Sequence, residues 1–452
     1  MTYDLTIVDK PYRFTLDFLH LKTNKNKLKI VLPWDKYSDQ PYVIKDRQLK
    51  KKIYKKVRFD FLKMLLVNVL VWPFAVMAYF LPAKKKAVDS RQFFGLGVNL
   101  GETKLKEIQL MVEDLGCEYL IIRIPLHDIE RLDDYVAFIA GFSDKKLLIN
   151  ILQDRRHVED HSLLIDSLHK IFTACSPYTH DFQVGHAVNR KKWAFFSMDE
   201  YLQFYQVAYK LKTQHYPKIQ LMGSSVIDFE YYFTIRTLFN FYKLKYDRFN
   251  SLLYVDRRGA PENQQMGLDV IAKIKLLHAI LRLSPKSSTD IVITETNWPI
   301  TNTFPYAPTS EKECVSVEEY AKYLLRYYML AYASQQVSQV YWHQLIAPGY
   351  GLVDNREGLV KYPAYQVFKC MVSILSGSEF ISFNVENHNM YTVYFENKTQ
   401  NIAVCWALQE QKIDTTGKKV LSKEGDLLDS GVLLLGDSPV YLIDNKKKYE
   451  VS

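Results

Sequence analysis

The chain has 452 residues, 48% of them hydrophobic, which is enough to bury a large core and excludes disorder over most of its length. Much of the formal net charge of +9 comes from basic residues near the N-terminus; the remainder has no basic run or RNA-binding motif, so no nucleic-acid partner is expected. The five cysteines are scattered without metal-ligand spacing, and the sequence predicts no disulfide framework, metal site or cofactor.

Residues 1–60 are predicted to form a small, β-rich N-terminal region. Apolar and polar residues alternate at 12–16 and again at 28–32, as in half-buried strands. Nothing in this region indicates a function.

Residues 61–86 are predicted to be a membrane segment. The 18 residues 64–81 carry no charge, which is about the minimum length for spanning a bilayer. Pro73 would kink a spanning helix, so a monotopic segment lying partly in one leaflet is an alternative, and a buried core helix is another. The flanking basic residues favour an anionic membrane surface, and they are Lys50, Lys51, Lys52, Lys55, Lys56 and Arg58 before the run and Lys84, Lys85 and Lys86 after it.

The two basic flanks also predict an orientation. More lysine and arginine residues precede the run than follow it, which places the N-terminus in the cytoplasm. If the segment spans a bacterial inner membrane, the domain after it lies on the periplasmic side. A re-entrant segment would leave that domain in the cytoplasm.

Residues 92–375 are predicted to fold as a TIM (β/α)8 barrel of the α/β class. Short apolar runs recur, each followed by polar residues and then by a helical pattern, which is typical of a parallel barrel. The eight runs lie at 97–99, 120–124, 147–152, 182–185, 220–223, 251–254, 291–294 and 340–342. Catalytic residues of such barrels lie at the C-terminal ends of the strands, so the polar residues after each run are the site candidates.

The seventh and eighth runs carry a family resemblance. Residues 293–299 (ITETNWP) resemble the seventh-strand signature of the large (β/α)8 glycoside hydrolase clan, which implies that Glu295 is the nucleophile. Residues 341–345 (YWHQL) resemble the eighth strand of that clan, which implies that Trp342 floors the sugar subsite. A carboxylate beside an indole suits an oxocarbenium-like transition state.

The fourth run departs from the clan pattern. Residues 185–193 (GHAVNRKKW) keep Gly185, Asn189, Arg190 and Trp193 of the resemblance, but His186, Ala187 and Val188 replace an Asn, the acid/base Glu and a Pro. A retaining mechanism needs two carboxyl groups about 5 to 5.5 Å apart. Because Ala187 supplies none, the remaining catalytic candidates are Asp228, Glu230, Asp256 and His186, which is equally consistent with a packing residue.

Arginines after several runs suggest an acidic substrate, because the guanidinium group binds carboxylate or phosphate bidentately. The Asn that His186 displaces normally grips the hydroxyl next to the anomeric carbon, which a 3-deoxy sugar such as Kdo lacks. The expected substrate-binding residues are Arg123, Asp154, Arg155, Asn189, Arg190, Tyr254, Arg257, Trp298, Trp342 and His343. In these respects the chain resembles a subunit of the membrane-associated Kdo hydrolases that trim lipopolysaccharide, although an anomeric carboxylate would repel a Glu295 nucleophile.

Residues 376–452 are predicted to form a β-sandwich accessory domain. Short strand patterns at 380–387, 390–396, 402–408 and 440–443 are separated by polar turns. Accessory domains of this kind accompany barrels of the resembled clan.

Two functions follow from the sequence. The first is a membrane-anchored glycosidase acting on a cell-envelope glycan, with a carbohydrate or glycolipid substrate and membrane lipids as partners. The second is a pseudo-glycosidase that uses the cleft to bind glycan or to scaffold a second membrane protein subunit. Loss of the acid/base Glu at Ala187 favours the second, and retention of Glu295, Trp298, Trp342 and Asn189 favours the first.

Overall fold

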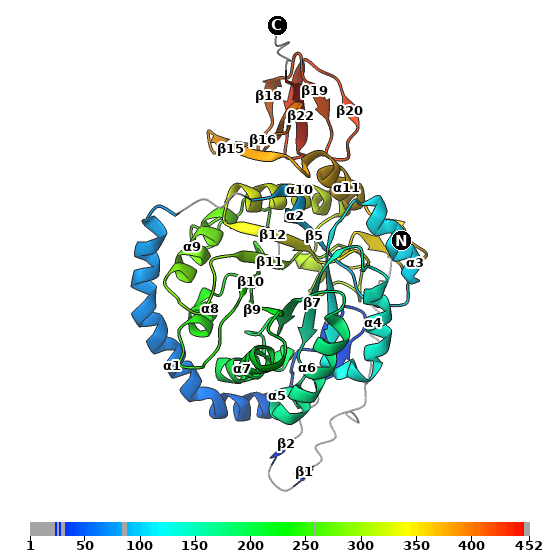
Figure 1. The fold of residues 1–452 in the computed structure, drawn as a ribbon. Coiled ribbons are helices and arrows are strands. Elements are labelled where there is room, and N and C mark those ends of the chain that lie inside the picture. Colours follow the sequence, from blue (N-terminus) through cyan, green and yellow to red (C-terminus); the bar gives the residue numbers. More distant parts are fainter. Residues whose placement is uncertain (1–22, 25–26, 29–31, 84–87, 257–258, 447–452) are drawn as a thin grey trace, which may run out of the picture.

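The computed structural model describes residues 23–24, 27–28, 32–83, 88–256 and 259–446. Its centre is a closed barrel of eight parallel strands, joined in the order β10-β11-β12-β5-β6-β7-β8-β9 (Figure 1). The strands are β5 (Phe94–Gly97), β6 (Tyr119–Pro125), β7 (Lys146–Leu152), β8 (Asp181–Val184), β9 (Gln220–Ile227), β10 (Arg248–Leu252), β11 (Ile291–Thr296) and β12 (Val337–Trp342). The predicted (β/α)8 barrel is therefore confirmed.

Two of the predicted strands are displaced along the chain. The run predicted at 251–254 corresponds to β10, which ends at Leu252, and the run at 97–99 corresponds to β5, which ends at Gly97. Leu253 and Val98 remain buried although they have left the ladder. These residues are apolar because they are buried at the end of the barrel, and not because they pair with a neighbouring strand. The predicted strand bounds are shifted for this reason.

Helices surround the barrel and bury their apolar faces against it (Figure 1). They include α3 (Leu105–Asp114), α4 (Leu132–Ala140), α6 (His161–Cys175), α7 (Met198–His215), α8 (Tyr231–Leu238), α9 (Val270–Arg282), α10 (Val317–Ala333) and α11 (Pro363–Leu375), with the short α2 (Ser90–Phe93) and α5 (Arg155–Glu159). A capping box between Ser316 and Glu319 starts α10. Tyr328 on this helix is fully buried, and its hydroxyl donates to the Gly95 carbonyl of β5 at 3.0 Å. This tyrosine is therefore part of the core.

Helix α1 (Arg47–Phe80) lies outside the ring, along α8 and α9 (Figure 1). The Asp46 carboxylate caps it by accepting from the backbone N–H groups of Gln48 and Leu49. The helix is long and apolar enough to cross a membrane, and only 11% of its most apolar 18-residue window is buried. The alternative of a buried core helix does not describe it. Lys84, Lys85 and Lys86 of the basic flank lie outside the described residues.

The part of the N-terminal region that the structure describes contains four short strands, namely β1 (Thr23–Asn24), β2 (Lys27–Leu28), β3 (Trp34–Asp35) and β4 (Gln40–Pro41). Strands β3 and β4 form a hairpin, which is here called the cleft hairpin and comprises residues 34–41. The strand predicted at 12–16 lies outside the described residues, as does 29–31 of the second predicted stretch.

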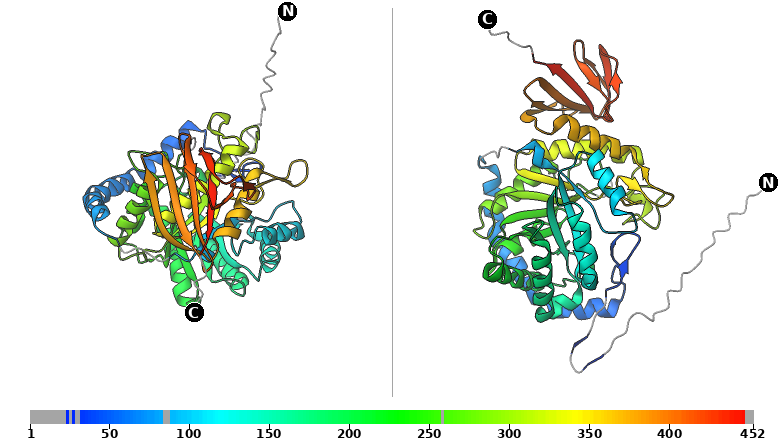
Figure 2. Two further views of the ribbon diagram at one scale, coloured as in Figure 1. Left: turned by 90° about the horizontal axis from the view of Figure 1, so that it is seen from above. Right: turned by 45° about the vertical axis from the view of Figure 1, so that its right-hand side comes forward.

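The C-terminal residues form a separate antiparallel sheet domain beside α10 and α11 (Figure 2). Its six-stranded sheet has the order β15-β16-β17-β22-β19-β20, and β18 pairs with β21 in a second sheet. The strands are β15 (Glu379–Glu386), β16 (Met390–Glu396), β17 (Gln400–Ala407), β18 (Gln411–Asp414), β19 (Lys419–Leu421), β20 (Leu427–Leu428), β21 (Val432–Leu435) and β22 (Val440–Asn445). All four predicted strands are present, together with shorter strands that the sequence pattern did not reveal.

Candidate functional site

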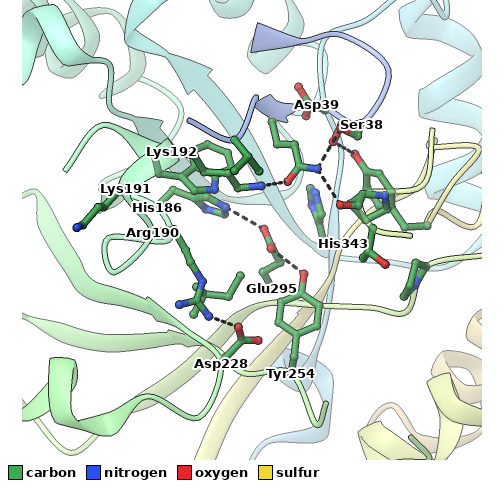
Figure 3. A pocket seen from close by; sticks show the side chains of 18 of the residues that line it. Ser38, Asp39, His186, Arg190, Lys191, Lys192, Asp228, Tyr254, Glu295 and His343 are labelled. Atoms are coloured by element: carbon green, nitrogen blue, oxygen red, sulfur yellow. Dashed lines mark hydrogen bonds and ion pairs between the residues drawn. The ribbon is translucent and has the colours of Figure 1, made fainter. Parts of the chain in front are cut away.

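A cavity of about 410 Å³ lies at the C-terminal ends of the barrel strands (Figure 3). This is the end at which (β/α)8 barrels carry their chemistry, and the volume suits a small ligand. Most of the polar side chains around it come from the segments that follow the strands. The lining includes Asp39, Lys50, Ile53, Arg123, His186, Arg190, Lys191, Lys192, Trp193, Asp228, Tyr254, Asp256, Glu295, Asn297, His343 and Tyr350.

Three side chains contact the carboxylate of Glu295 in the cavity. This residue stands near the end of β11 and is buried. One carboxylate oxygen accepts from Arg123 Nη2 at 2.5 Å and lies 3.3 Å from His186 Nε2, and the other accepts from the Tyr254 hydroxyl at 2.7 Å (Figure 3). Because Arg123 and Tyr254 donate to different oxygens, the carboxylate is held in one orientation. A preorganised reacting group requires such a fixed orientation.

The protonation states of these groups follow from their burial. Burial raises the pKa of Glu295, while Arg123 and the Tyr254 hydrogen bond act in the opposite direction. Burial also holds the pKa of His186 well below its usual range, and the positive charge of Arg123 adds to this effect. His186 is therefore neutral near pH 7, and its 3.3 Å contact with Glu295 is not an ion pair.

Arg123, near the end of β6, joins two carboxylates. Its Nη2 binds Glu295, and its Nη1 binds the Asp39 carboxylate at 3.2 Å. Asp39 was not among the sequence candidates, because it lies on the cleft hairpin rather than after a barrel strand. Withdrawal from bulk water raises the pKa of Asp39, although the Arg123 charge and the Trp34 indole N–H act against this shift.

The cleft hairpin is held in place by contacts with several parts of the barrel. The Trp34 ring lies 5.5 Å from the ring of Trp193 and 4.8 Å from that of His127, measured between centroids. Gln40 donates to the Pro308 carbonyl at 3.2 Å and accepts from Lys192 at 2.5 Å. The only sequence signal for this arrangement is a polar turn before Pro41, and that signal gives no indication of where the hairpin docks.

The end of β8 is apolar where the clan resemblance places the acid/base Glu. Ala187 is fully buried in a cluster with Leu152, Trp193 and Leu252, and Trp34 of the cleft hairpin packs against the same cluster. The φ angle of Ala187 is +44°, in the left-handed region that disfavours side chains. No proton donor is available at this position.

The other predicted carboxylates around β9 are paired with one arginine. Arg190 contacts Asp228 through Nη2 and Glu230 through Nη1, the latter at 2.8 Å. Asn189 donates to Glu230 at 2.6 Å. Asp228 lines the cavity and Glu230 does not, whereas Asp256, after β10, also lines it. Of the predicted alternatives, Asp228, Asp256 and His186 therefore share a cavity with Glu295.

Five predicted binding residues are not part of the cavity lining, and one of them is Asn189, which donates to Glu230. Asp154 caps α5 by accepting from the His157 backbone at 2.9 Å, and the next residue, Arg155, is buried against Glu200. Trp298 and Trp342 are buried and stacked on each other with 6.0 Å between centroids, and neither lines the cavity. The expected sugar-stacking floor of Trp342 is thus absent from this structure, and Arg257 lies outside the described residues.

His343 and Tyr350 lie where the Trp342 indole was expected. Both line the cavity, and their rings are stacked with 5.4 Å between centroids. Burial, helped by Arg123, holds the pKa of His343 well below its usual range, so this ring is also neutral. Among the described residues no three His, Cys, Asp or Glu side chains are grouped to hold a metal ion.

Comparisons with known proteins identify the fold. No known family matches the sequence, and no curated protein matches it. A family 39 glycoside hydrolase from the gut symbiont Bacteroides cellulosilyticus matches with a TM-score of 0.61 at 14% identity, covering 79% of this chain and 82% of that chain. The chain has the fold of a glycoside hydrolase.

Two further solved structures agree with this result. A GH30 endoxylanase from Clostridium papyrosolvens matches with a TM-score of 0.55 at 11% identity, over 81% of this chain and 98% of that chain. A monomeric β-xylosidase from Caulobacter crescentus matches with a TM-score of 0.54 at 11% identity, over 80% of this chain and 97% of that chain. The predicted resemblance to (β/α)8 glycoside hydrolases is confirmed at the level of the fold.

Proposed function

We propose that this protein is a glycoside hydrolase in which Glu295 is the central catalytic carboxylate. The observation that carries the proposal is the position of Glu295 in the cavity, held by Arg123 and Tyr254. A buried carboxylate with fixed orientation stabilises the positive charge that develops at the anomeric carbon when a glycosidic bond breaks. A purely structural carboxylate would have no need of a cavity beside it.

The proton that the leaving group needs comes from another side chain than residue 187. Three further carboxylates line the same cavity as Glu295, and they are Asp39, Asp228 and Asp256. Asp228 is paired with Arg190, and Asp39 is paired with Arg123. In this proposal Glu295 occupies one of the two carboxylate positions of a retaining glycosidase. The proton donor is a different side chain from the one expected at the second position, Ala187.

The substrate in this proposal is a cell-envelope glycan with an acidic sugar, such as Kdo on lipopolysaccharide. Five cationic side chains line the cavity, and they are Lys50, Arg123, Arg190, Lys191 and Lys192. Such a set attracts carboxylate or phosphate groups of a ligand. Because a carboxylate on the anomeric carbon repels Glu295, for such a sugar Glu295 assists water or a second residue instead of attacking directly.

In this proposal the protein acts at the bacterial inner membrane, where α1 attaches it to lipid. The apolar composition of α1 supports attachment, and the charge on its flank supports a periplasmic barrel if the helix spans. A second membrane protein subunit is a further proposed partner. Such a subunit would present the substrate to the cavity.

A non-catalytic role is the second candidate. The apolar cluster around Ala187 and the cleft hairpin that packs against it favour a pseudo-glycosidase that binds glycan or scaffolds a membrane complex. In that case the cavity retains ligand affinity without hydrolysis.

The test is to incubate the purified full chain, alone and with co-purifying proteins, with lipopolysaccharide from a strain that lacks it, and to analyse released sugars by mass spectrometry. We expect sugar release, and Glu295→Gln should lower its rate at least about a hundredfold, because the amide cannot serve as base or anion. Release that survives this substitution contradicts the role of Glu295. Glycan binding without release under any condition favours the non-catalytic role.

Glu262→Gln is the matched control. Glu262 is also buried and paired with an arginine, Arg326, and it accepts from the Trp406 indole at 2.8 Å. It lies outside the cavity. Both substitutions remove a buried ion pair and cost stability, but only Glu295→Gln should abolish sugar release at a temperature where both variants are folded.

A further inference from the structure

Two charged residues in the middle of helix α1 form ion pairs with helices of the barrel. Asp60 pairs with Arg236 on α8 at 3.3 Å, and Lys63 pairs with Asp199 on α7 at 2.5 Å. The Asp60 carboxylate also accepts from the backbone N–H of Met198 at 2.7 Å. The Asp60 side chain is largely buried by these contacts and the Lys63 side chain stays 57% exposed, so Asp60 marks the face of α1 that packs on the barrel.

The same orientation continues into the uncharged part of the helix. Asn68, the only strongly polar residue among residues 64–81, donates to the Tyr232 carbonyl on α8 at 2.9 Å. Small residues complete the inward face, with Ala75 and Ala78 buried against the barrel. The one strongly polar side chain of this stretch is therefore bonded within the protein.

The opposite face of α1 is exposed and apolar. Its large exposed side chains are Phe59, Leu62, Leu65, Leu66, Val69, Leu70, Trp72, Phe74, Val76, Met77, Phe80 and Leu81. Soluble monomers rarely expose a contiguous apolar patch of more than about 300–600 Å² without a binding partner. The outward face of α1 thus has the character of a surface that meets an apolar medium.

Two features favour lipid over a protein partner. Protein interfaces carry about one hydrogen bond per 100–200 Å² and a polar rim, whereas Trp72 is the only large exposed side chain of residues 64–81 with an N–H or O–H group, and an indole also suits a membrane interface. The preceding turns of the same helix are basic and exposed, with Lys51, Lys52, Lys55 and Arg58 directed to solvent. Cationic turns beside an apolar face complement anionic headgroups above hydrocarbon.

We propose that α1 stays packed on the barrel and lies in the plane of one bilayer leaflet, with its outward face in the acyl boundary and its basic turns among anionic headgroups. At 1.5 Å per residue its 34 residues are about 51 Å long, and the uncharged residues 64–81 make up about 27 Å of that length. Crossing the bilayer would require α1 to leave α8, and Asn68 would lose its hydrogen bond to the Tyr232 carbonyl and keep only the one to Met64 in its own helix.

This orientation brings the cavity to the membrane surface. Lys50 and Ile53 of α1 line the cavity, so the helix that contacts lipid also forms part of the cleft wall. A glycan attached to a lipid in the same leaflet can then reach Glu295 without leaving the membrane. This consequence rests on the proposed function, whereas the in-plane position of α1 does not.

The test is flotation of the full chain with vesicles of phosphatidylcholine containing phosphatidylglycerol, and with vesicles of phosphatidylcholine alone. We expect binding to both, stronger with the anionic lipid and weakened by salt for that lipid. Leu66→Asp combined with Leu70→Asp should reduce vesicle binding at least about tenfold for each leucine, because each loses its transfer into hydrocarbon.

Leu110→Asp is the matched control. Leu110 on α3 and Leu66 on α1 are both 56% exposed, and the two helices lie on opposite sides of the barrel in Figure 1. Leu110→Asp should bind vesicles as the unsubstituted chain does. Equal loss in both variants, or no vesicle binding by the unsubstituted chain, overturns the proposal, as does a stable dimer formed through this face without lipid.

Depth measurements separate the in-plane position from a spanning helix. A fluorophore is attached at Leu62→Cys, Leu70→Cys or Phe80→Cys, all outward positions, and quenched by nitroxides at known depths in the bilayer. Similar shallow depths at the three positions support the proposal, and a deep Leu70 between two shallow ends overturns it. Glu295→Gln should bind vesicles normally, so a failure of catalysis and a failure of membrane binding are distinguished.

Discussion

Strands β8 and β11 end at the same cavity, and the residues at their ends have opposite surroundings. At β11, Glu295 is bound by Arg123, Tyr254 and His186. At β8, Ala187 packs in an apolar cluster that includes Trp193. In a retaining glycosidase these two positions would hold a pair of carboxylates.

The difference between the two strand ends shows which side of the cavity holds the carboxylate and its hydrogen-bond donors. At β11 the carboxylate is surrounded by hydrogen-bond donors. At β8 an apolar cluster fills the position of the expected carboxylate, and the polar residues that follow this strand line the cavity without supplying one. Polar groups from outside the barrel, above all Asp39 of the cleft hairpin, reach the cavity on the Arg123 side. The carboxylate that the clan resemblance implies at the end of β8 is thus missing, and the cleft hairpin contributes Asp39 to the cavity.

Removing Arg123 should have the largest effect on the polar side. Arg123→Met leaves Glu295 and Asp39 without their shared cation, and we expect a loss of about 3–5 kcal/mol in the free energy of unfolding at pH 7. The pKa of Glu295 should rise further, because Arg123 lowers it in the unsubstituted protein. A carboxyl whose pKa is raised on folding contributes most stability below its unfolded pKa and loses it as pH rises.

The destabilisation by Arg123→Met should therefore shrink on acidification toward pH 4, which urea unfolding at several pH values would measure. Arg190→Met is the control, because Arg190 also binds two carboxylates but its side chain is 26% exposed against 8% for Arg123. It should cost only about 1 kcal/mol. Equal costs for the two arginines contradict the assignment of Arg123 to a buried polar centre.

Restoring the missing carboxylate should have the next largest effect. Ala187→Glu forces a larger, polar side chain into the apolar cluster at the end of β8, and we expect a loss of about 3 kcal/mol in the free energy of unfolding. Ala187→Gly is the control and should change stability by less than about 1 kcal/mol, because the φ of +44° suits glycine and offsets the lost methyl group. Thermal unfolding measures both. If Ala187→Glu were stable and increased glycan hydrolysis, the end of β8 would be an intact catalytic position.

The features of the fold and site that the sequence predicted are those set by local pattern. The Thr294-Glu295-Thr296 stretch at the end of an apolar run placed the carboxylate on a strand, and the strand ends placed Arg123 and Tyr254 near it. Barrel topology alone brings such positions together. The absence of a carboxylate at Ala187 was also legible from the sequence.

The features that the sequence did not predict depend on side-chain direction or on distant contacts. Trp342 points to the helix layer, where its indole donates to the Tyr320 hydroxyl at 2.6 Å, since side chains on a strand alternate between two faces. Asp154 follows a strand but serves as a helix cap. Asp39 reaches Arg123 across 84 positions in the sequence, and no local pattern encodes such a contact.

The smallest expected effect concerns the carboxylate that came from outside the barrel. Asp39→Asn removes a negative charge that raises the pKa of Glu295, so the pKa of Glu295 should fall. The free energy of unfolding should change by no more than about 1 kcal/mol, because the loss of the Asp39–Arg123 pair is offset by the weaker repulsion between carboxylates. Titration of ¹³C-labelled glutamate carboxyls by NMR measures the shift, with Glu295→Gln assigning the signal.

Asp35→Asn is the control that separates an electrostatic effect of Asp39 on Glu295 from a disturbance of the cleft hairpin. Asp35 lies on the same hairpin and accepts from the Ser38 hydroxyl at 2.8 Å, but it does not line the cavity. It should leave the pKa of Glu295 unchanged, whereas Asp39→Asn lowers it and moves the acid limb of any pH–rate profile to lower pH, since Glu295 acts as a carboxylate. If both substitutions shift Glu295 equally, the hairpin only shields the cavity, and Asp39 is not electrostatically part of the site.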